Sequence, residues 1–165
     1  MASTVAQSAR ANLHAFFDSQ GVARARVIFA PRVAQEAHLA RLPLADLALD
    51  TLPTGSHTTG SDALWAGVPM VSAVGALFAG RVGASLLHAV GLDELVAPDL
   101  EGYFQIALAL ASDPAWYAQI RKRLAQARSE AALFDTLRFT RDLERLYLAI
   151  VKREVEGGEG AVTVG

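Results

Sequence analysis

The middle of the chain, residues 47–74, alternates apolar and polar blocks in a way that predicts an α/β crossover. Two apolar runs, residues 45–50 and 68–74, flank a loop rich in Pro, Gly, Thr and Ser and a short helical segment at about residues 59–66. Strands of a parallel sheet are covered on both faces and are therefore mainly apolar, and the second run, residues 68–74, carries no charged residue. Because the loop after the first strand and the start of the helix face the ligand crevice of such a unit, we expect a binding site there.

The flanking segments predict mainly helices. Apolar residues recur at helical spacing in residues 4–20, 81–90, 100–110, 114–128 and 136–154, and in the second half of residues 32–42. Short apolar runs at residues 26–30 and 95–97 predict two further strands. We expect one domain, residues 1–155, followed by a disordered Gly-rich tail, residues 156–165.

The final helix carries a continuous apolar stripe between Phe139 and Val151. Such a stripe has to pack against a partner. Any part of the stripe that stays exposed is expected to drive formation of a homo-oligomer.

Length, charge and composition narrow the classes of protein. The 165 residues suffice for one domain with a core, and the formal net charge of −2 favours neither a nucleic-acid groove nor a polybasic membrane surface. The uncharged stretch between Asp62 and Arg81 is divided by Gly67 and Pro69, so it indicates buried core and not a membrane span. The chain has no cysteine, which suits a reducing compartment, and we expect a cytoplasmic location.

The loop before the central helix has the chemistry of an anion site. Thr58 and Thr59 bring hydroxyls and unpaired backbone N–H groups to a helix start, where the dipole is positive. His57 precedes them, and Asp62 is expected in the first turn, where its carboxylate can cap the helix or accept hydrogen bonds from sugar hydroxyls. For the loop taken by itself, a purely structural interpretation, with Thr58 or Thr59 as N-cap and Asp62 complementing the dipole, is the favoured one.

Two charged residues nearby have less specific interpretations. Asp50 ends the first apolar run, where functional residues of open α/β sheets gather, but it can also cap the turn formed by Pro53 and Gly55. Arg81 stands at a helix start, where a cation is unfavourable for the dipole. We expect Arg81 to pair with a carboxylate or, as the alternative, to face an anion.

A longer series of residues continues on both sides of this loop. It comprises Pro31, His38, Arg41, Leu44-Ala45-Asp46, Leu49-Asp50-Thr51, His57-Thr58-Thr59, Asp62, Leu64-Trp65-Ala66-Gly67, Pro69-Met70-Val71, Phe78-Ala79, Arg81-Val82, Ala84-Ser85, Leu87, Leu133-Phe134-Asp135-Thr136 and Leu143-Glu144-Arg145-Leu146-Tyr147. In this order the residues resemble the C-terminal part of the O-GlcNAc transferase family, which includes SPINDLY-like and bacterial tetratricopeptide-repeat members. The resemblance extends from Val27 to about Arg153.

This resemblance implies a fold. Family members join a helical repeat array to a GT-B catalytic unit, in which a sugar nucleotide lies between two Rossmann-like lobes. The chain resembles only the later part of the second lobe, without its first strand and without the first lobe. We therefore expect an α/β fold, an incomplete Rossmann-like lobe with a short parallel sheet flanked by helices and a helical C-terminus.

The resemblance also implies roles for residues of the central loop. His57, Thr58 and Thr59 are expected to bind the diphosphate, and Asp62 is expected to bind the ribose. The phosphates of this family are held by side chains and a helix end, so we expect neither a metal nor a cofactor. No catalytic base can be named in this sequence.

Three residues of the preceding helix are implied to bind the nucleoside. His38 corresponds to a histidine that stacks on uracil, and Arg41 to an arginine beside the base, which suits an imidazole face and a planar guanidinium. Gln35 stands where many members have a lysine that contacts the nucleotide. A glutamine can hydrogen-bond a base or ribose but cannot neutralise phosphate.

The implied function is the UDP-binding half of a glycosyltransferase that transfers N-acetylglucosamine from the donor substrate UDP-GlcNAc to Ser or Thr hydroxyls of proteins. We expect the isolated chain to be inactive, since acceptor-side residues lie in the missing parts. The expected partners are UDP or a UDP-sugar and an acceptor protein, with neither nucleic acid nor membrane. The alternatives are another GT-B enzyme with a small or lipid acceptor, and a non-catalytic association module.

Overall fold

The computed structural model describes residues 4–155 of the chain, which divides into two compact units, Met1–His38 and Leu39–Gly165. The first unit contains helix α1 (Thr4–Ser19) and the short 3-10 helix η1 (Arg24–Arg26), and helix α2 (Gln35–Arg41) begins in this unit and ends in the next. The disordered tail predicted for residues 156–165 lies outside the described residues.

The strand predicted at residues 26–30 is wrong. Beyond η1, residues 27–34 adopt no regular secondary structure, and the Ile28 side chain is 83% exposed. The β-branched composition of this segment favours a strand, but a strand also needs a hydrogen-bonded neighbour and an apolar surface on which to pack. In the described part of the chain the segment pairs with no strand, and only Val27 and Phe29 of residues 26–30 are partly buried.

The second unit is built on a parallel sheet of the strands β1 (Ala48–Leu49), β2 (Met70–Ala73) and β3 (Val96–Ala97), in the order β1-β2-β3. Ala48 lies opposite Met70, and Ala73 lies opposite Ala97. Helix α3 (Thr58–Trp65) connects β1 to β2, and helix α4 (Val82–Ala89) connects β2 to β3. These crossovers confirm the α/β arrangement expected from the sequence.

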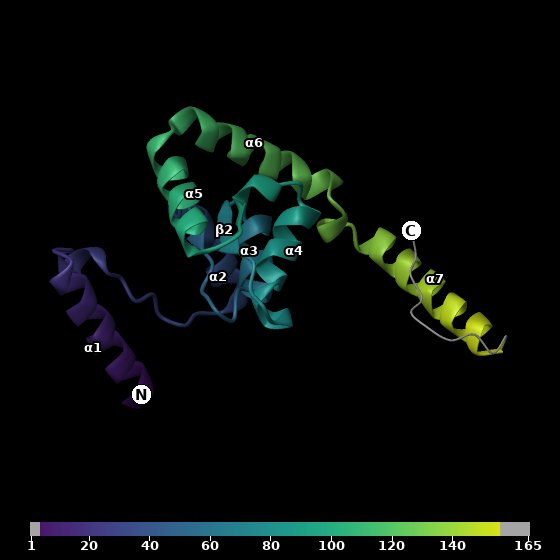
Figure 1. Ribbon diagram of the computed structural model, residues 1–165, viewed down its shortest axis with the longest axis horizontal. Coiled ribbons are helices and arrows are strands. Elements are labelled where there is room, and N and C mark those ends of the chain that lie inside the picture. The colour runs from purple at the N-terminus through teal and green to yellow at the C-terminus, as the bar shows by residue number, and fades with distance from the viewer. Residues whose placement is uncertain (1–3, 156–165) are drawn as a thin grey trace. The chain divides into compact units, whose positions relative to one another are not determined.

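Helices lie against the central strand. Helix α5 (Leu100–Ser112) contacts β2 and β3, α4 also contacts β2, and Figure 1 shows β2 between α4 and α5. Helix α6 (Pro114–Glu130) packs on α5, and both helices begin at an aspartate N-cap, Asp99 and Asp113. The remaining short 3-10 helices are η2 (Leu42–Leu44), η3 (Phe78–Gly80), η4 (Asp93–Leu95) and η5 (Ala132–Phe134).

The core of the second unit lies between the sheet and these helices. All four residues of β2 are buried, because helices and neighbouring strands surround it. The core side chains are Leu64, Met70, Val71, Leu87, Val90, Leu92, Leu95, Leu110, Ile120 and Leu124. No helix in the described part of the chain combines the length and the apolar character that a membrane span needs.

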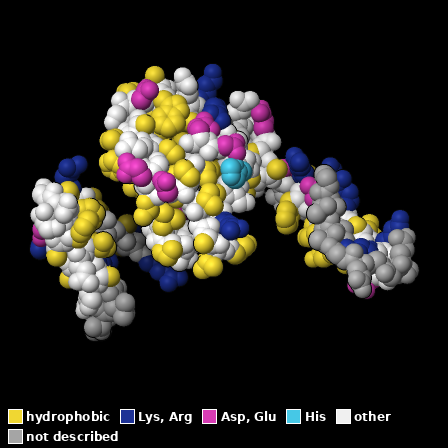
Figure 2. Space-filling view, in the orientation of Figure 1, with side chains coloured by type: hydrophobic (Ala, Val, Ile, Leu, Met, Phe, Trp, Pro, Cys, Tyr) yellow, Lys and Arg dark blue, Asp and Glu magenta, His cyan; other side chains and the backbone are white. Residues whose placement is uncertain are grey.

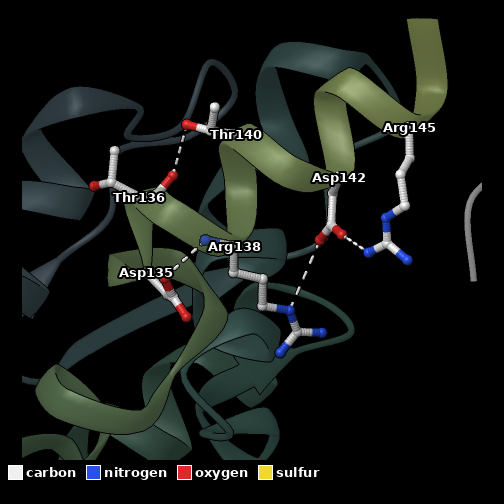
Figure 3. Close-up of polar contacts among 6 residues, drawn as sticks. All are labelled: Asp135, Thr136, Arg138, Thr140, Asp142 and Arg145. Atoms are coloured by element: carbon white, nitrogen blue, oxygen red, sulfur yellow. Dashed lines mark hydrogen bonds and ion pairs between the residues drawn. The ribbon is translucent and has the colours of Figure 1, made fainter. Parts of the chain in front are cut away.

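Helix α7 (Thr136–Val155) follows η5, which it contacts. Asp135 accepts a hydrogen bond from the Arg138 backbone N–H at 2.8 Å, and Asp142 pairs with both Arg138 and Arg145 (Figure 3). None of the side chains described in α7 is buried, and its apolar and basic side chains both reach the surface in Figure 2.

Candidate functional site

The candidate site is the loop after β1 together with the start of α3. Helix α3 begins at Thr58 with His57 as its N-cap, and the His57 side chain makes no capping hydrogen bond. The His57 carbonyl accepts hydrogen bonds from the N–H groups of Gly60 and Ser61, both at 3.1 Å. Within the described residues, the N–H groups of Thr58 and Thr59 have no acceptor. Two donors at the positive end of the α3 dipole are thus available to an anion.

The expected first-turn position of Asp62 is wrong by one turn. Because the cap is His57, Asp62 is the fifth residue of α3 and lies in its second turn, and the first turn holds no acidic side chain. The structural alternative with Thr58 or Thr59 as N-cap is also wrong. Asp62 is half-buried, whereas His57, Thr58 and Thr59 are exposed.

The neighbouring loop between β2 and α4 holds the His57 ring. The His57 Nε2 atom lies 3.3 Å from the Ala79 carbonyl oxygen, and the ring meets that of Phe78 edge-on at 6.2 Å between centroids. The Gly75 N–H donates to the Gly80 carbonyl at 2.9 Å, which closes this loop. His57 is therefore oriented by contacts with a second loop.

Arg81 stabilises the same loop. Its guanidinium donates to the carbonyl oxygens of Gly75 and Ala76, each at 3.1 Å. The expectation that Arg81 pairs with a carboxylate is wrong. Backbone carbonyls that converge at the turn take the place of a carboxylate, and they satisfy a cation that the α4 dipole alone disfavours.

Asp50 supports the base of the first loop. It is 4% exposed, its Oδ1 accepts from the Ser56 N–H at 2.5 Å, and its Oδ2 accepts from the Ser72 hydroxyl at 2.6 Å. Of the two interpretations of Asp50, the capping of the loop turn is thereby confirmed, although the Ser72 partner was missed. Ser72 is a hydroxyl residue in the otherwise apolar β2, and that exception in the sequence was the signal that could have identified it.

Tyr103 of α5 joins the same network. Its hydroxyl donates to the Asp50 carbonyl oxygen at 2.9 Å. Partial burial and then the negative charge of Asp50 raise the pKa of Tyr103 above its ordinary value of 10.0.

The predicted site residues are divided between the two units. Arg41, His57, Thr58, Thr59 and Asp62 belong to the unit of residues 39–165, with the last four in or beside the start of α3. The other two predicted residues, Gln35 and His38, belong to the unit of residues 1–38.

The three nucleoside-binding candidates lie along helix α2. Gln35 is its first residue and is exposed, while His38 and Arg41 are half-buried and one turn apart. This spacing places the imidazole and the guanidinium on neighbouring parts of one helix, as predicted. Their roles in binding stay predictions.

A family model and two curated proteins are similar to most of this chain. The model of glycosyl transferase family 41 matches residues 5–143. A UDP-N-acetylglucosamine–peptide N-acetylglucosaminyltransferase from Caenorhabditis elegans is 38% identical over 138 residues, which is 84% of this chain and 12% of that protein. The probable transferase SEC of the same description from Arabidopsis thaliana is 39% identical over 130 residues, which is 78% of this chain and 13% of that protein.

A solved structure is similar over the same region. A mutant O-GlcNAc transferase from Thermobaculum terrenum superposes with a TM-score of 0.76 and 36% identity, covering 84% of this chain and 26% of that one. This similarity, together with the three-stranded parallel sheet, confirms the predicted fold class. The chain spans only about an eighth of the length of the two curated relatives.

Proposed function

This chain belongs to glycosyl transferase family 41, and we propose from that membership that it forms the UDP-binding part of a glycosyltransferase. The complete enzyme would transfer N-acetylglucosamine from UDP-GlcNAc to Ser or Thr hydroxyls of proteins. The names of the similar transferases, which describe peptide N-acetylglucosaminyltransferases, support this substrate assignment. The donor sugar nucleotide is a substrate, and the proposal includes no cofactor.

The observation that carries the proposal is the start of α3. Two N–H groups without acceptors in the described structure, the exposed His57 ring and two threonine hydroxyls lie at the positive end of one helix. A diphosphate offers the negative charge and the acceptor oxygens that this arrangement fits. We assign His57, Thr58 and Thr59 to the diphosphate.

The remaining candidates would bind the nucleoside. Asp62 would accept hydrogen bonds from ribose hydroxyls, as its half-buried position one turn into α3 permits. His38 would stack on uracil with Arg41 beside it, and Gln35 would hydrogen-bond the base or ribose. These roles follow the family resemblance of each position.

The chemical contribution of this part is stabilisation of the leaving group. As the bond from the sugar to the β-phosphate breaks, negative charge grows on UDP. Donors fixed before the reaction stabilise that charge without reorganising. We assign no catalytic base to this chain, and we expect it to transfer no sugar by itself because the acceptor side would come from the rest of the enzyme.

A thermal shift experiment tests the proposal. A ligand that binds only the folded chain raises its melting temperature, so UDP should raise that of the wild-type chain. His57→Ala should abolish the shift. His88→Ala is the matched control, because His88 lies in the last turn of α4 and pairs with Asp93 of η4. A wild-type chain that UDP does not stabilise would overturn the assignment.

Helix α7 supports a proposal about partners. Its apolar stripe includes Phe139, Tyr147 and Val151, which are 63, 60 and 61% exposed. We propose that two copies of this chain pair through this stripe, since an identical stripe offers a matching apolar surface. Sedimentation should show a dimer that Phe139→Glu dissociates and that Arg145→Glu, on the polar side, leaves intact. A monomeric wild-type chain would contradict the pairing.

The setting of the complete protein is also a proposal. We propose that this part follows a tetratricopeptide array and works in the cytoplasm, which suits a chain without cysteine. Sequencing the upstream reading frame tests the array. An upstream frame without such repeats would favour the enzyme with a small or lipid acceptor.

A further inference from the structure

Asp50 is a buried acidic residue to which the proposed function assigns no role. Its N–H donates to the Val71 carbonyl at 3.0 Å, which ties its backbone to β2. Its side chain is tied to the same strand by the Ser72 hydroxyl at 2.6 Å. Both the backbone and the carboxyl group of Asp50 are therefore fixed to the rigid centre of the sheet.

The second carboxyl oxygen of Asp50 closes the loop that follows it. The Ser56 N–H donates to Asp50 Oδ1 at 2.5 Å, and the Gly55 N–H donates to the Thr51 carbonyl at 2.6 Å. The loop thus leaves β1 at Asp50 and returns to the Asp50 side chain six residues later. The next residue after Ser56 is His57, the N-cap of α3.

The burial of this carboxyl group indicates that its position matters. Among the described side chains, no Lys, Arg or His forms an ion pair with Asp50, which is 4% exposed. Burying a charge without a counter-ion is costly unless hydrogen bonds compensate it. The two donors that compensate it here belong to the sheet and to the loop.

The carboxyl group is also in close contact with α4. A Cβ atom on Gly83, in the first turn of α4, would overlap Asp50 Oδ2 and lie 2.5 Å from Ser72 Oγ. Gly83 therefore lets the helix pack directly on the carboxyl group. The group is held by α4 on one side and by β2 on another.

We propose that Asp50 is a positioning residue that sets the loop before α3 in the geometry that receives the diphosphate. This inference rests on the proposed function. Because Asp50 fixes the Ser56 amide, it fixes the direction in which His57 enters α3 and where the Thr58 and Thr59 N–H groups point. A site arranged in advance binds its ligand without the cost of ordering a loop.

Four variants separate positioning from general stability, with UDP affinity measured by calorimetry and unfolding free energy by urea titration. Asp50→Ala removes both acceptors, and UDP affinity should fall about 10- to 100-fold, as expected when binding groups are misplaced. Asp50→Asn should stay within about threefold of wild type, because its amide oxygen can accept from Ser56 while its NH2 donates to the Ser72 hydroxyl, which can reverse.

Two further variants lower stability but leave the loop anchored. Ser72→Ala removes the hydroxyl from one carboxyl oxygen and leaves the Ser56 hydrogen bond in place. Leu124→Ala opens a cavity at a residue that is fully buried in α6. Both should unfold at lower urea concentration than wild type yet bind UDP within about threefold of it, a range set by the usual additivity of separate sites.

The outcomes are distinguishable. A wild-type chain that does not bind UDP overturns the proposed function and, with it, this inference. A wild-type chain that binds UDP while Asp50→Ala binds it equally well overturns the positioning role alone, as does a loss of affinity in Leu124→Ala equal to that in Asp50→Ala. Should Asp50→Ala not fold, Asp50→Ser, whose short hydroxyl does not reach both partners, carries the same expectation.

Discussion

At the scale of single residues, Gly83 lies against the buried Asp50 carboxyl group. Adding one carbon atom at Gly83 therefore tests how closely the two pack. In an exposed helix, replacing Gly by Ala stabilises by about 1 kcal/mol, because Ala loses less backbone entropy. At Gly83 the new Cβ would overlap Asp50 Oδ2. Helix propensity alone predicts that Gly83→Ala stabilises the fold. Because of this packing, we expect the substitution to destabilise it.

We expect Gly83→Ala to lower the free energy of unfolding by about 1–3 kcal/mol, the usual cost of overpacking. Urea denaturation measures it. Gly102→Ala in α5 is the matched control, since the nearest atom to its Cβ would be Pro98 Cδ at 3.1 Å, and its effect should be smaller. Equal stability of wild type and Gly83→Ala would show that the Asp50 carboxyl group has room to move.

Tyr103 makes the free energy of unfolding depend on pH. Its pKa is raised in the folded chain, so the folded form holds the hydroxyl proton more tightly than the unfolded form does. The stability from this group is complete below the ordinary pKa of 10.0 and is lost as pH rises through the folded pKa. Tyr103→Phe should lose about 1 kcal/mol with its hydrogen bond at neutral pH, and this deficit should shrink above pH 10.

Urea titrations at a series of pH values measure that change. Tyr117→Phe is the matched control, because the Tyr117 hydroxyl also donates to a backbone carbonyl, that of Asp46, at 2.9 Å. A deficit in Tyr103→Phe that stays constant through the alkaline range would contradict the linkage.

The candidate site was predictable from the sequence to the extent that local pattern determines it. The hydroxyl-rich segment from His57 to Thr59 does form a helix start, because the breaks in apolar periodicity mark that boundary. Ser72 stood out as a hydroxyl residue in an apolar run, but its pairing with Asp50, 22 residues away, and the carbonyl partners of Arg81 do not follow from local pattern. Contacts of that kind depend on how the elements pack.

At the scale of elements, the sequence located the helices and the central strand but not every boundary. Helices α5 and α6 begin at Leu100 and Pro114, as predicted, and each is preceded by an aspartate N-cap, which is a local signal. The predicted strands at residues 45–50 and 68–74 are present but shorter, as Ala48–Leu49 and Met70–Ala73. The segment at residues 26–30 forms no strand, because its β-branched composition does not by itself provide a neighbouring strand to which it can hydrogen-bond.

The N-cap of α6 offers a test at this scale. Asp113 accepts hydrogen bonds from the N–H groups of Ala115 and Trp116 at 2.9 and 3.0 Å. Asp113→Ala should lower the free energy of unfolding by about 1 kcal/mol, the usual contribution of a cap. Urea titration measures it, and Asp113→Asn, which keeps a capping oxygen, should recover most of the loss.

At the scale of the whole molecule, stability resides in the unit of residues 39–165, where the buried side chains form one cluster around β2. Leu124 joins α6 to this cluster and has no exposed surface, whereas Leu148 of α7 is 72% exposed. The two leucines therefore differ in environment but not in chemistry.

Leu124→Ala should lower the free energy of unfolding by about 2–5 kcal/mol, because it removes buried methyl groups and leaves a cavity. Leu148→Ala should change the free energy of unfolding by less than about 0.5 kcal/mol, as surface substitutions usually do. Thermal or urea unfolding of both variants measures the difference. Similar losses in the two would place α7 in the cooperative core.

The shortness of the outer strands has a consequence for how the molecule opens. β1 and β3 have two residues each, and both pair with β2, whose four residues are buried. Local fluctuations can release either two-residue strand without disturbing the other. Dissolved in heavy water, the chain should therefore exchange the Val74 amide, which donates to the Ala97 carbonyl of β3, sooner than the amides of the buried helix residues Ile120 and Leu124, because local release of β3 is enough to free it.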